Sequence, residues 1–310
     1  MVTSISSYTA IDLPGGWVGY VFSPGEESVG TCRDIALGRW RAWLVQLVSD
    51  PSALLGYQVL KYSRTREVVR ARLPAERGTP DEDLEVVCKH SEVEGWGRRL
   101  LRASRCSRAH RDFDRARMLP RIGIDTARPL ALLEKRLSPR SAWLVTEYLA
   151  NVVDLDQAAL NLLPQCPPHR TRAIKNRLIH AVAKCFALLR RHKLHHRDLK
   201  ASNLLIAHWD DPAAPARVYV VDLEGLRGRR WWKPREWRQP LIRLAASLLS
   251  YRSITRSDYA RFLRSYLSCV GFAPGEWKDL FYTVAPQADR YARRSQTRKA
   301  NKLDGYAGNG

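Results

Sequence analysis

Residues 194–206, LHHRDLKASNLLI, are followed after a turn by residues 218–222, VYVVD, and together they carry the most specific pattern in the chain. Asp198 and Lys200 stand two positions apart, Asn203 follows, and Asp222 ends an apolar run. This order suits phosphoryl transfer, in which one carboxylate accepts or orients the acceptor hydroxyl, a lysine contacts the phosphoryl group, and an amide and a second carboxylate hold magnesium. The pattern therefore predicts Asp198 and Lys200 as catalytic residues, and Asn203 and Asp222 as metal ligands.

A lone HRD tripeptide would be weak evidence, because polar residues cluster in any loop. Here the polar set is followed by an apolar stretch at 204–206, a proline-containing turn at 210–215 and the apolar run that ends in Asp222. Loop, strand, turn, strand and carboxylate is the succession that the chemistry needs. His196 is expected to support the loop by hydrogen bonding and to take no part in the chemistry.

Chain length and net charge indicate what class of protein this is and what partners it favours. The 310 residues suffice for one two-lobed domain, and 52 basic against 31 acidic residues give a formal charge of +21. Such a charge favours polyanions, such as an anionic membrane surface or a phosphorylated glycolipid, although basic residues on solvated helix faces explain it equally well. No dedicated nucleic-acid motif is seen.

The six cysteines are widely spaced, which predicts reduced thiols in a cytoplasmic protein. Neither a signal peptide nor an apolar run long enough to cross a membrane is evident. Any membrane contact is therefore expected to be peripheral, at the inner face of the cytoplasmic membrane.

The first half of the chain predicts a β-rich region. Residues 57–61 and 67–73 alternate like the strands of a hairpin. The hairpin lacks a glycine-rich phosphate loop, but Ser63, Arg64 and Thr65 at its turn offer hydroxyl, guanidinium and main-chain donors to a nucleotide phosphate. An ordinary exposed basic turn fits the same residues.

A lysine that contacts the nucleotide phosphates is predicted at Lys89, which lies near the end of the β-branched strand 84–90. Lys61 ends a similar strand and is the alternative. Lys89 is favoured because a helix over 108–119 comes next, and its inner edge carries Asp112, the predicted carboxylate partner of this lysine.

Residues 128–134 and 142–149 read as a two-stranded ribbon followed by a connector. In a two-lobed kinase this connector is the hinge, so main-chain groups near Glu147 and Leu149 are predicted to meet adenine. This assignment rests on position along the chain.

The second half is predicted to be mainly helical, with helices over 172–192, 241–251, 258–269 and 276–294. A short basic loop with several tryptophans, residues 223–238, precedes the second of these helices and suits a phosphorylated, sugar-containing acceptor. The predicted organisation is α+β: residues 1–50 as an N-terminal extension of unknown role, 51–150 as a small β-rich N-lobe, 151–294 as a helical C-lobe, and 295–310 as a basic, disordered tail.

Taken together, these stretches resemble the lipopolysaccharide kinase family of Kdo/WaaP type. The most specific part is 196–205, supported by 87–89, 109–131 and 221–224. The resemblance implies a protein-kinase-like fold and transfer of phosphate, with ATP and Mg²⁺, to a Kdo or heptose sugar of a glycolipid at the cytoplasmic face of the inner membrane. The chain departs from the family pattern at Asp112, where Glu is commoner, and in its first fifty residues.

Two other functions fit parts of the pattern. A small Ser/Thr or Tyr protein kinase would use the same catalytic loop, but the chain lacks the A-P-E segment that forms a peptide platform. A non-catalytic module that binds ATP or a polyanion would suit the charge and the missing glycine-rich loop, but it would not need Asp198, Asn203 and Asp222.

Overall fold

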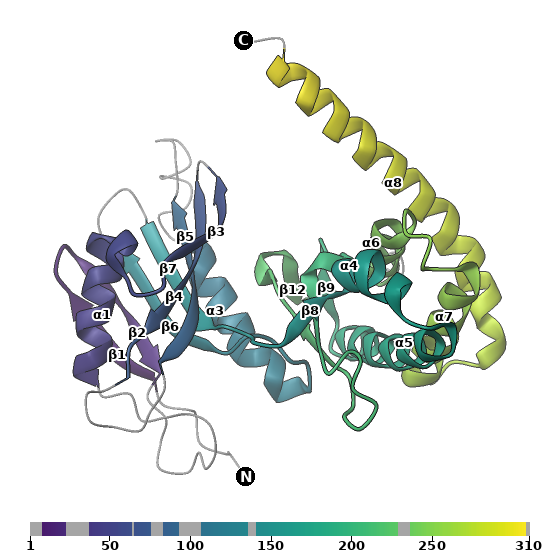
Figure 1. Cartoon of the computed structure of the whole chain (residues 1–310), viewed down its shortest axis with the longest axis horizontal. Coiled ribbons are helices and arrows are strands. Elements are labelled where there is room, and N and C mark those ends of the chain that lie inside the picture. The colour runs from purple at the N-terminus through teal and green to yellow at the C-terminus, as the bar shows by residue number, and fades with distance from the viewer. Residues whose placement is uncertain are drawn as a thin grey trace. The chain divides into compact units, whose positions relative to one another are not determined.

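The computed structural model describes residues 8–22, 37–63, 65–75, 83–92, 107–135, 141–228 and 236–307. The chain divides into two compact units (Figure 1). Unit 1 comprises residues 1–118 and 127–149, and unit 2 comprises 119–126 and 150–310.

Unit 1 is built on a seven-stranded antiparallel sheet of order β1-β2-β6-β7-β5-β4-β3. The N-terminal strands β1 and β2 form a hairpin whose second strand pairs with β6, so these two strands belong to the same sheet as the other strands of the unit. The strands are β1 Tyr8–Leu13, β2 Trp17–Phe22, β3 Gln58–Ser63, β4 Arg66–Leu73, β5 Leu84–Glu92, β6 Pro129–Lys135 and β7 Ser141–Glu147.

Two helices, α1 Leu37–Ser49 and α3 Arg108–Met118, cover opposite faces of this sheet (Figure 1). Successive strand residues point to opposite faces. On β6, Leu133 packs in the core cluster that contains the α1 residue Leu44, whereas the adjacent Leu132 packs with Phe113 of α3. The sheet is therefore buried between the two helices.

Unit 2 is mainly helical, with three short strands in one sheet, order β11-β10-β8, and a second sheet of β12 and β9. Its long helix α5 packs against α7, and α6 packs against α8. The elements are α4 Leu155–Gln157, α5 Pro168–Arg191, α6 Arg238–Leu248, α7 Arg256–Val270, α8 Trp277–Ala307, β8 Val152–Asp154, β9 Leu194–His196, β10 Leu204–Ala207, β11 Arg217–Val220 and β12 Leu226–Gly228.

The predicted α+β architecture, a β-rich first part and a helical second part, is confirmed. The prediction of a disordered tail from residue 295 differs from the structure, in which α8 continues without a break to Ala307. Residues 295–307 contain no proline and only one glycine, so nothing in this stretch forces the helix to end earlier.

Candidate active site

The catalytic loop of unit 2 is the segment between β9 and β10. Its apolar residues are anchored in the core, since Leu199 and Ala201 are fully buried. The side chains of Asp198 and Lys200, on either side of Leu199, are about half exposed, at 50% and 46%. Alternation of buried apolar and exposed polar residues thus presents the two predicted catalytic groups to solvent.

His196 connects this loop to Asp222, which follows β11. The N–H of Asp198 donates to Nδ1 of His196 at 3.3 Å, and the other ring nitrogen, Nε2, lies 3.1 Å from the main-chain oxygen of Asp222. Since Nδ1 accepts, the proton of the neutral ring is on Nε2, which donates to that oxygen. Burial lowers the pKa of His196 to about 4, so the ring is neutral near pH 7. His196 thus supports the loop by hydrogen bonding, as predicted from the sequence.

The predicted metal ligands are brought together by the backbone. The side-chain N–H of Asn203 donates to the main-chain oxygen of Asp198 at 2.7 Å, which leaves its amide oxygen as the group able to hold a cation. The carbonyl of Asn203 accepts from the N–H of Val221 at 3.0 Å, so Asp222 follows directly on. Asp222 has a left-handed backbone, with φ 57°, a conformation that costs a non-glycine residue free energy and is concentrated at functional sites.

An amide oxygen and one carboxylate fit Mg²⁺, which is bound through one or two protein oxygens while substrate phosphates and water complete its shell. Within the described residues, no group of three or more His, Cys, Asp or Glu side chains is placed to hold a metal ion. A site formed by Asn203 and Asp222 contains only one carboxylate, so it would not be counted among such groups.

Two cations lie next to the carboxylate of Asp198. Nζ of Lys200 is 3.9 Å from Oδ2, and Nη1 of Arg243 on α6 is 3.7 Å from Oδ1. Ser247, one helical turn after Arg243, accepts the N–H of Ala201 at 3.0 Å. Neither α6 residue was predicted from the sequence; their spacing of four on a predicted helix was the available signal.

In unit 1, Lys89 lies on the face of the sheet that α3 covers. Its cross-strand neighbours in register are Val68 on β4 and Leu144 on β7, and Leu144 packs against α3. Among the described residues, Nζ of Lys89 makes no hydrogen bond or ion pair. Asp112 forms an ion pair of 3.1 Å with Arg115, and the described part of the chain shows none between Asp112 and Lys89.

The β3–β4 turn carries the predicted phosphate contacts. Ser63 is exposed, and its hydroxyl donates to the carbonyl of Arg66 at 3.3 Å, while the carbonyl of Thr65 accepts from the N–H of Glu92. Arg64 lies outside the described residues. The hydroxyl groups of Ser63 and Thr65 can rotate toward a bound ligand.

The segment predicted to be the hinge follows β7. The side chain of Glu147 accepts the N–H of Arg128 at 2.9 Å and so braces β6 against β7. Two residues on, the main-chain N–H and carbonyl of Leu149 are bonded to no protein group within the described residues. The main-chain N–H and carbonyl of Leu149 can therefore hydrogen-bond to a nucleotide base. The Glu147 carboxylate, by contrast, is already bonded to Arg128.

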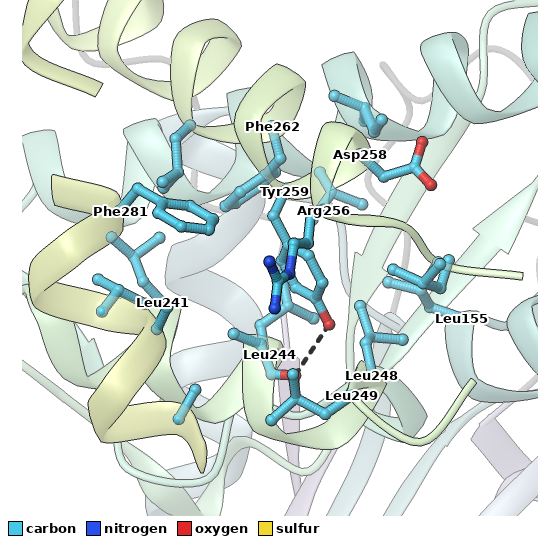
Figure 2. Close-up of a pocket in the computed structure, with 18 of the residues that line it drawn as sticks. Leu155, Leu241, Leu244, Leu248, Leu249, Arg256, Asp258, Tyr259, Phe262 and Phe281 are labelled. Atoms are coloured by element: carbon cyan, nitrogen blue, oxygen red, sulfur yellow. Dashed lines mark hydrogen bonds between the residues drawn. The ribbon is translucent and has the colours of Figure 1, made fainter. Parts of the chain in front are cut away.

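A separate cavity of about 390 Å³ lies inside unit 2, between α5, α6, α7 and α8 (Figure 2). Its walls are mainly aliphatic and aromatic, including Leu241, Leu244 and Leu248 from α6. At its side, the hydroxyl of Tyr259 donates to the carbonyl of Ala245 at 3.3 Å. α6 thus has two roles: one face lines this cavity, and the face with Arg243 and Ser247 meets the catalytic loop.

A family model described as the lipopolysaccharide kinase (Kdo/WaaP) family matches residues 75–266, more than half of the chain and the whole of the catalytic loop. The chain belongs to the lipopolysaccharide kinase (Kdo/WaaP) family. The predicted family is confirmed, and with it the enzyme class: lipopolysaccharide kinases are phosphotransferases that act on sugar hydroxyls, so this chain is a kinase of lipopolysaccharide biosynthesis.

The solved structure described as WaaP in complex with acyl carrier protein is similar to this chain, with a TM-score of 0.56 and 24% identity over 77% of this chain and 89% of the other. This similarity supports the predicted kinase-like fold of the Kdo/WaaP family. Curated proteins give no match. In the part of the chain that the structure describes, every helix falls short, in length or in apolar character, of what a membrane crossing requires.

The structure thus brings Asp198, Lys200, Asn203 and Asp222 into one cluster of unit 2. The predicted nucleotide contacts of unit 1 lie on the α3-covered face, at the β3–β4 turn and after β7. Their joint action on one nucleotide stays a prediction; the residues concerned are Lys89, Asp112, Ser63, Thr65, Glu147 and Leu149.

Proposed function

We propose that this Kdo/WaaP family kinase transfers the γ-phosphate of ATP to a hydroxyl of a Kdo- or heptose-type sugar in a lipopolysaccharide core or a similar glycolipid. The observation that carries the proposal is the exposed carboxylate of Asp198, held on a loop that His196 and Asn203 tie to Asp222. A preorganised carboxylate at a solvent-accessible position is what an incoming sugar hydroxyl requires.

In the proposed reaction, Asp198 accepts a hydrogen bond from the sugar hydroxyl and orients its oxygen for in-line attack on the γ-phosphorus. The new bond joins the sugar oxygen to phosphorus as the bond from phosphorus to the bridging oxygen of ADP breaks. The hydroxyl proton passes to Asp198 and from there to water. Lys200 stabilises the negative charge of the phosphoryl group during transfer.

The residues Asn203 and Asp222 would hold Mg²⁺ through their side-chain oxygens. When bound there, the ion neutralises charge on the phosphate oxygens. The main-chain bonds around Val221 and Asp198 keep these two ligands adjacent without the ion, so the chain needs little rearrangement to bind it.

For the nucleotide, we assign the phosphate contact to Lys89, with Asp112 as its carboxylate partner once ATP is bound. Ser63, Arg64 and Thr65 would cover the phosphates from the β3–β4 turn. The base would meet the main chain at Leu149, next to Glu147, where the N–H and carbonyl have no protein partner within the described residues.

Two features favour a sugar acceptor over a peptide. The segment between Asp222 and α6 is short and lacks an A-P-E sequence, so it offers no extended peptide platform. It is also basic and rich in tryptophan. Of these tryptophans, Trp237 is described and is stacked on the guanidinium of Arg190 at 4.0 Å, whereas Trp231 and Trp232 lie outside the described residues.

The formal charge of +21 supports a peripheral location at the anionic inner face of the cytoplasmic membrane.

The test compares acceptors under identical conditions. The full-length protein is incubated with γ-labelled ATP, Mg²⁺ and one of three acceptors: a Kdo-terminated lipid A precursor, a heptose-terminated core glycolipid, or a mixture of generic protein substrates. The expected result is label on one of the two glycolipids, and none with Asp198→Ala. Label on protein alone would identify a protein kinase, and ATP binding without transfer to any acceptor would identify a non-catalytic module; either result would contradict the proposal.

A further inference from the structure

Tyr148, the first residue after β7, is held against the sheet of unit 1 by two contacts. Its main-chain N–H donates to the carbonyl of Glu85 on β5 at 3.0 Å. The centroid of its ring lies 4.0 Å from the guanidinium carbon of Arg70 on β4, a cation–π contact. Leu149 comes next and is the last residue of unit 1. The sheet therefore fixes the chain immediately before the main-chain groups of Leu149, which have no protein partner within the described residues.

Arg70 is itself oriented by Glu85. Its Nη2 lies 2.6 Å from both carboxylate oxygens of Glu85, and the two side chains are only 29% and 27% exposed. A guanidinium is planar, so these charge-assisted bonds determine the direction in which its face points. Glu85 thus holds Tyr148 twice, through its own carbonyl and through the guanidinium of Arg70.

These contacts lie on the face of the sheet that carries the proposed phosphate contact. Successive residues of a strand alternate between the two faces, so Glu85 and Lys89, four residues apart on β5, share one face. Arg70 pairs in register with Val87, midway between them, and belongs to the same face. An ion pair that only joined β4 to β5 would need no more than Arg70 and Glu85. The contact with Tyr148 extends this pair beyond the sheet, to the chain that leads to Leu149.

We propose that Arg70, through the ring of Tyr148, positions the main chain of Leu149 for recognition of the nucleotide base. The inference rests on the proposed function and deepens it, because it names the residues on which selection of adenine depends. Adenine presents a ring nitrogen that accepts a hydrogen bond next to a 6-amino group that donates one. These two groups match the N–H and the carbonyl of Leu149. Arg70 does not touch the nucleotide and is a positioning residue.

The experiment measures nucleotide binding, so that it does not depend on an acceptor. The full-length protein is titrated calorimetrically, in the presence of Mg²⁺, with ATP or with purine riboside triphosphate, which lacks the 6-amino group. The ratio of the two dissociation constants reports how well the base is recognised. The variants are Arg70→Met, Tyr148→Leu and the two combined. Arg72→Met is the control, because Arg72 lies on the same strand, 3.4 Å from the same carboxylate, and makes no ring contact among the described residues.

We expect the wild type and Arg72→Met to bind ATP about 3- to 10-fold more tightly than the analogue, the range for one hydrogen bond. Arg70→Met and Tyr148→Leu should each remove most of this preference, chiefly by weakening the binding of ATP. The double variant should lose no more than either single variant, because the two residues act through one contact. Tyr148→Leu leaves the ion pair of Arg70 and Glu85 in place, so it tests the proposal even if Arg70→Met does not fold.

A preference for ATP that survives in Arg70→Met and Tyr148→Leu would overturn the inference, as would equal affinity of the wild type for the two triphosphates. An equal loss of affinity for both triphosphates would overturn it too, and would assign Arg70 to the stability of the sheet. Failure of the proposed function looks different: no glycolipid is phosphorylated, although the preference for ATP and its dependence on Arg70 are intact. The absence of any ATP binding by the wild type would contradict both. The thermal midpoint of each variant shows whether it is folded.

Discussion

Nε2 of His196 donates a 3.1 Å hydrogen bond to the main-chain carbonyl of Asp222, and the same ring accepts the N–H of Asp198 through Nδ1. One neutral imidazole therefore fixes the spacing between Asp198, the proposed base, and Asp222, a proposed metal ligand. The ring is shielded from solvent, since His196 is fully buried. We therefore expect it to act on the proposed chemistry only by positioning Asp198 and Asp222.

Replacing this ring should slow catalysis more than it weakens binding. In His196→Asn the shorter side chain cannot reach both partners, so we expect kcat to fall by roughly 100-fold, as misplacement of a reacting group by about 1 Å does. The KM for ATP should change far less. Steady-state kinetics give both values, with His180→Asn on α5 as the control; equal losses in the two variants would show that His196 has no special role.

A methyl group at position 225 should disturb the same ring. A Cβ on Gly225 would lie 3.2 Å from two atoms of the His196 imidazole, closer than ordinary packing allows, whereas a Cβ on Gly228 would lie 3.8 Å from Leu194. We therefore expect Gly225→Ala to lower the free energy of unfolding by about 1–3 kcal/mol and to reduce activity, and Gly228→Ala to be close to wild type. Denaturant unfolding and steady-state kinetics of Gly225→Ala and Gly228→Ala measure the two effects. Equal behaviour of the two variants would mean that the ring moves aside without cost.

Lys89 should matter for catalysis and not for folding. Because its ammonium has no partner among the described residues, Lys89→Met should change the free energy of unfolding by no more than about 0.5 kcal/mol. Activity should fall by roughly 100-fold or more if the ammonium stabilises the phosphates. Lys61→Met, at the alternative and exposed position on β3, is the control in the same assays. A larger loss of activity in Lys61→Met would move the phosphate contact to β3.

The contact between α3 and the sheet should depend on pH. Nδ1 of His110 on α3 lies 3.0 Å from Oε2 of Glu134 on β6, and this hydrogen bond raises the pKa of His110 above its ordinary value of 6.5. Burial would raise the pKa of Glu134, but the bonds from His110 and Ser107 outweigh it and the pKa falls below 4.5. In the folded state, His110 and Glu134 are therefore both charged over a wider pH range than in the unfolded chain.

The stabilisation from this pair should be fully present from about pH 5 to 6.5 and lost as the pH rises through the raised pKa of His110. The free energy of unfolding of wild type minus that of Glu134→Gln should accordingly be largest near about pH 6 and shrink by about pH 9. Denaturant unfolding across this range measures it. A difference that stays constant or grows with pH would contradict the assignment.

The cluster of proposed catalytic residues could be predicted because its members lie close together along the chain. Asp198, Lys200 and Asn203 are within one loop, and Asp222 follows on the paired strand, so short-range spacing already carries the chemistry. Arg243 and Ser247 come from a helix whose docking depends on tertiary packing, which no local pattern reports. The apolar cavity was missed for the same reason, since a helical stripe that lines a cavity looks like one that fills a core.

The first fifty residues show a second limit. The sequence indicated only an extension of unknown role, and the structure has the strands β1 and β2 and the helix α1 there. That β2 pairs with β6, more than a hundred residues later, was not predictable, because pairing between distant strands leaves no local signal. The tail differs from its prediction because a basic composition does not by itself prevent a helix.

Single-turnover transfer of phosphate to a glycolipid acceptor measures the role proposed for Asp198, which is to orient a sugar hydroxyl for attack on the γ-phosphate of ATP. Preloaded wild-type protein and Asp198→Asn, which keeps the shape of the side chain, are mixed with the acceptor, and the labelled product is quantified with time. We expect transfer to slow by at least about 1000-fold in Asp198→Asn while ATP is bound as tightly as before. Transfer by Asp198→Asn at the wild-type rate would contradict it.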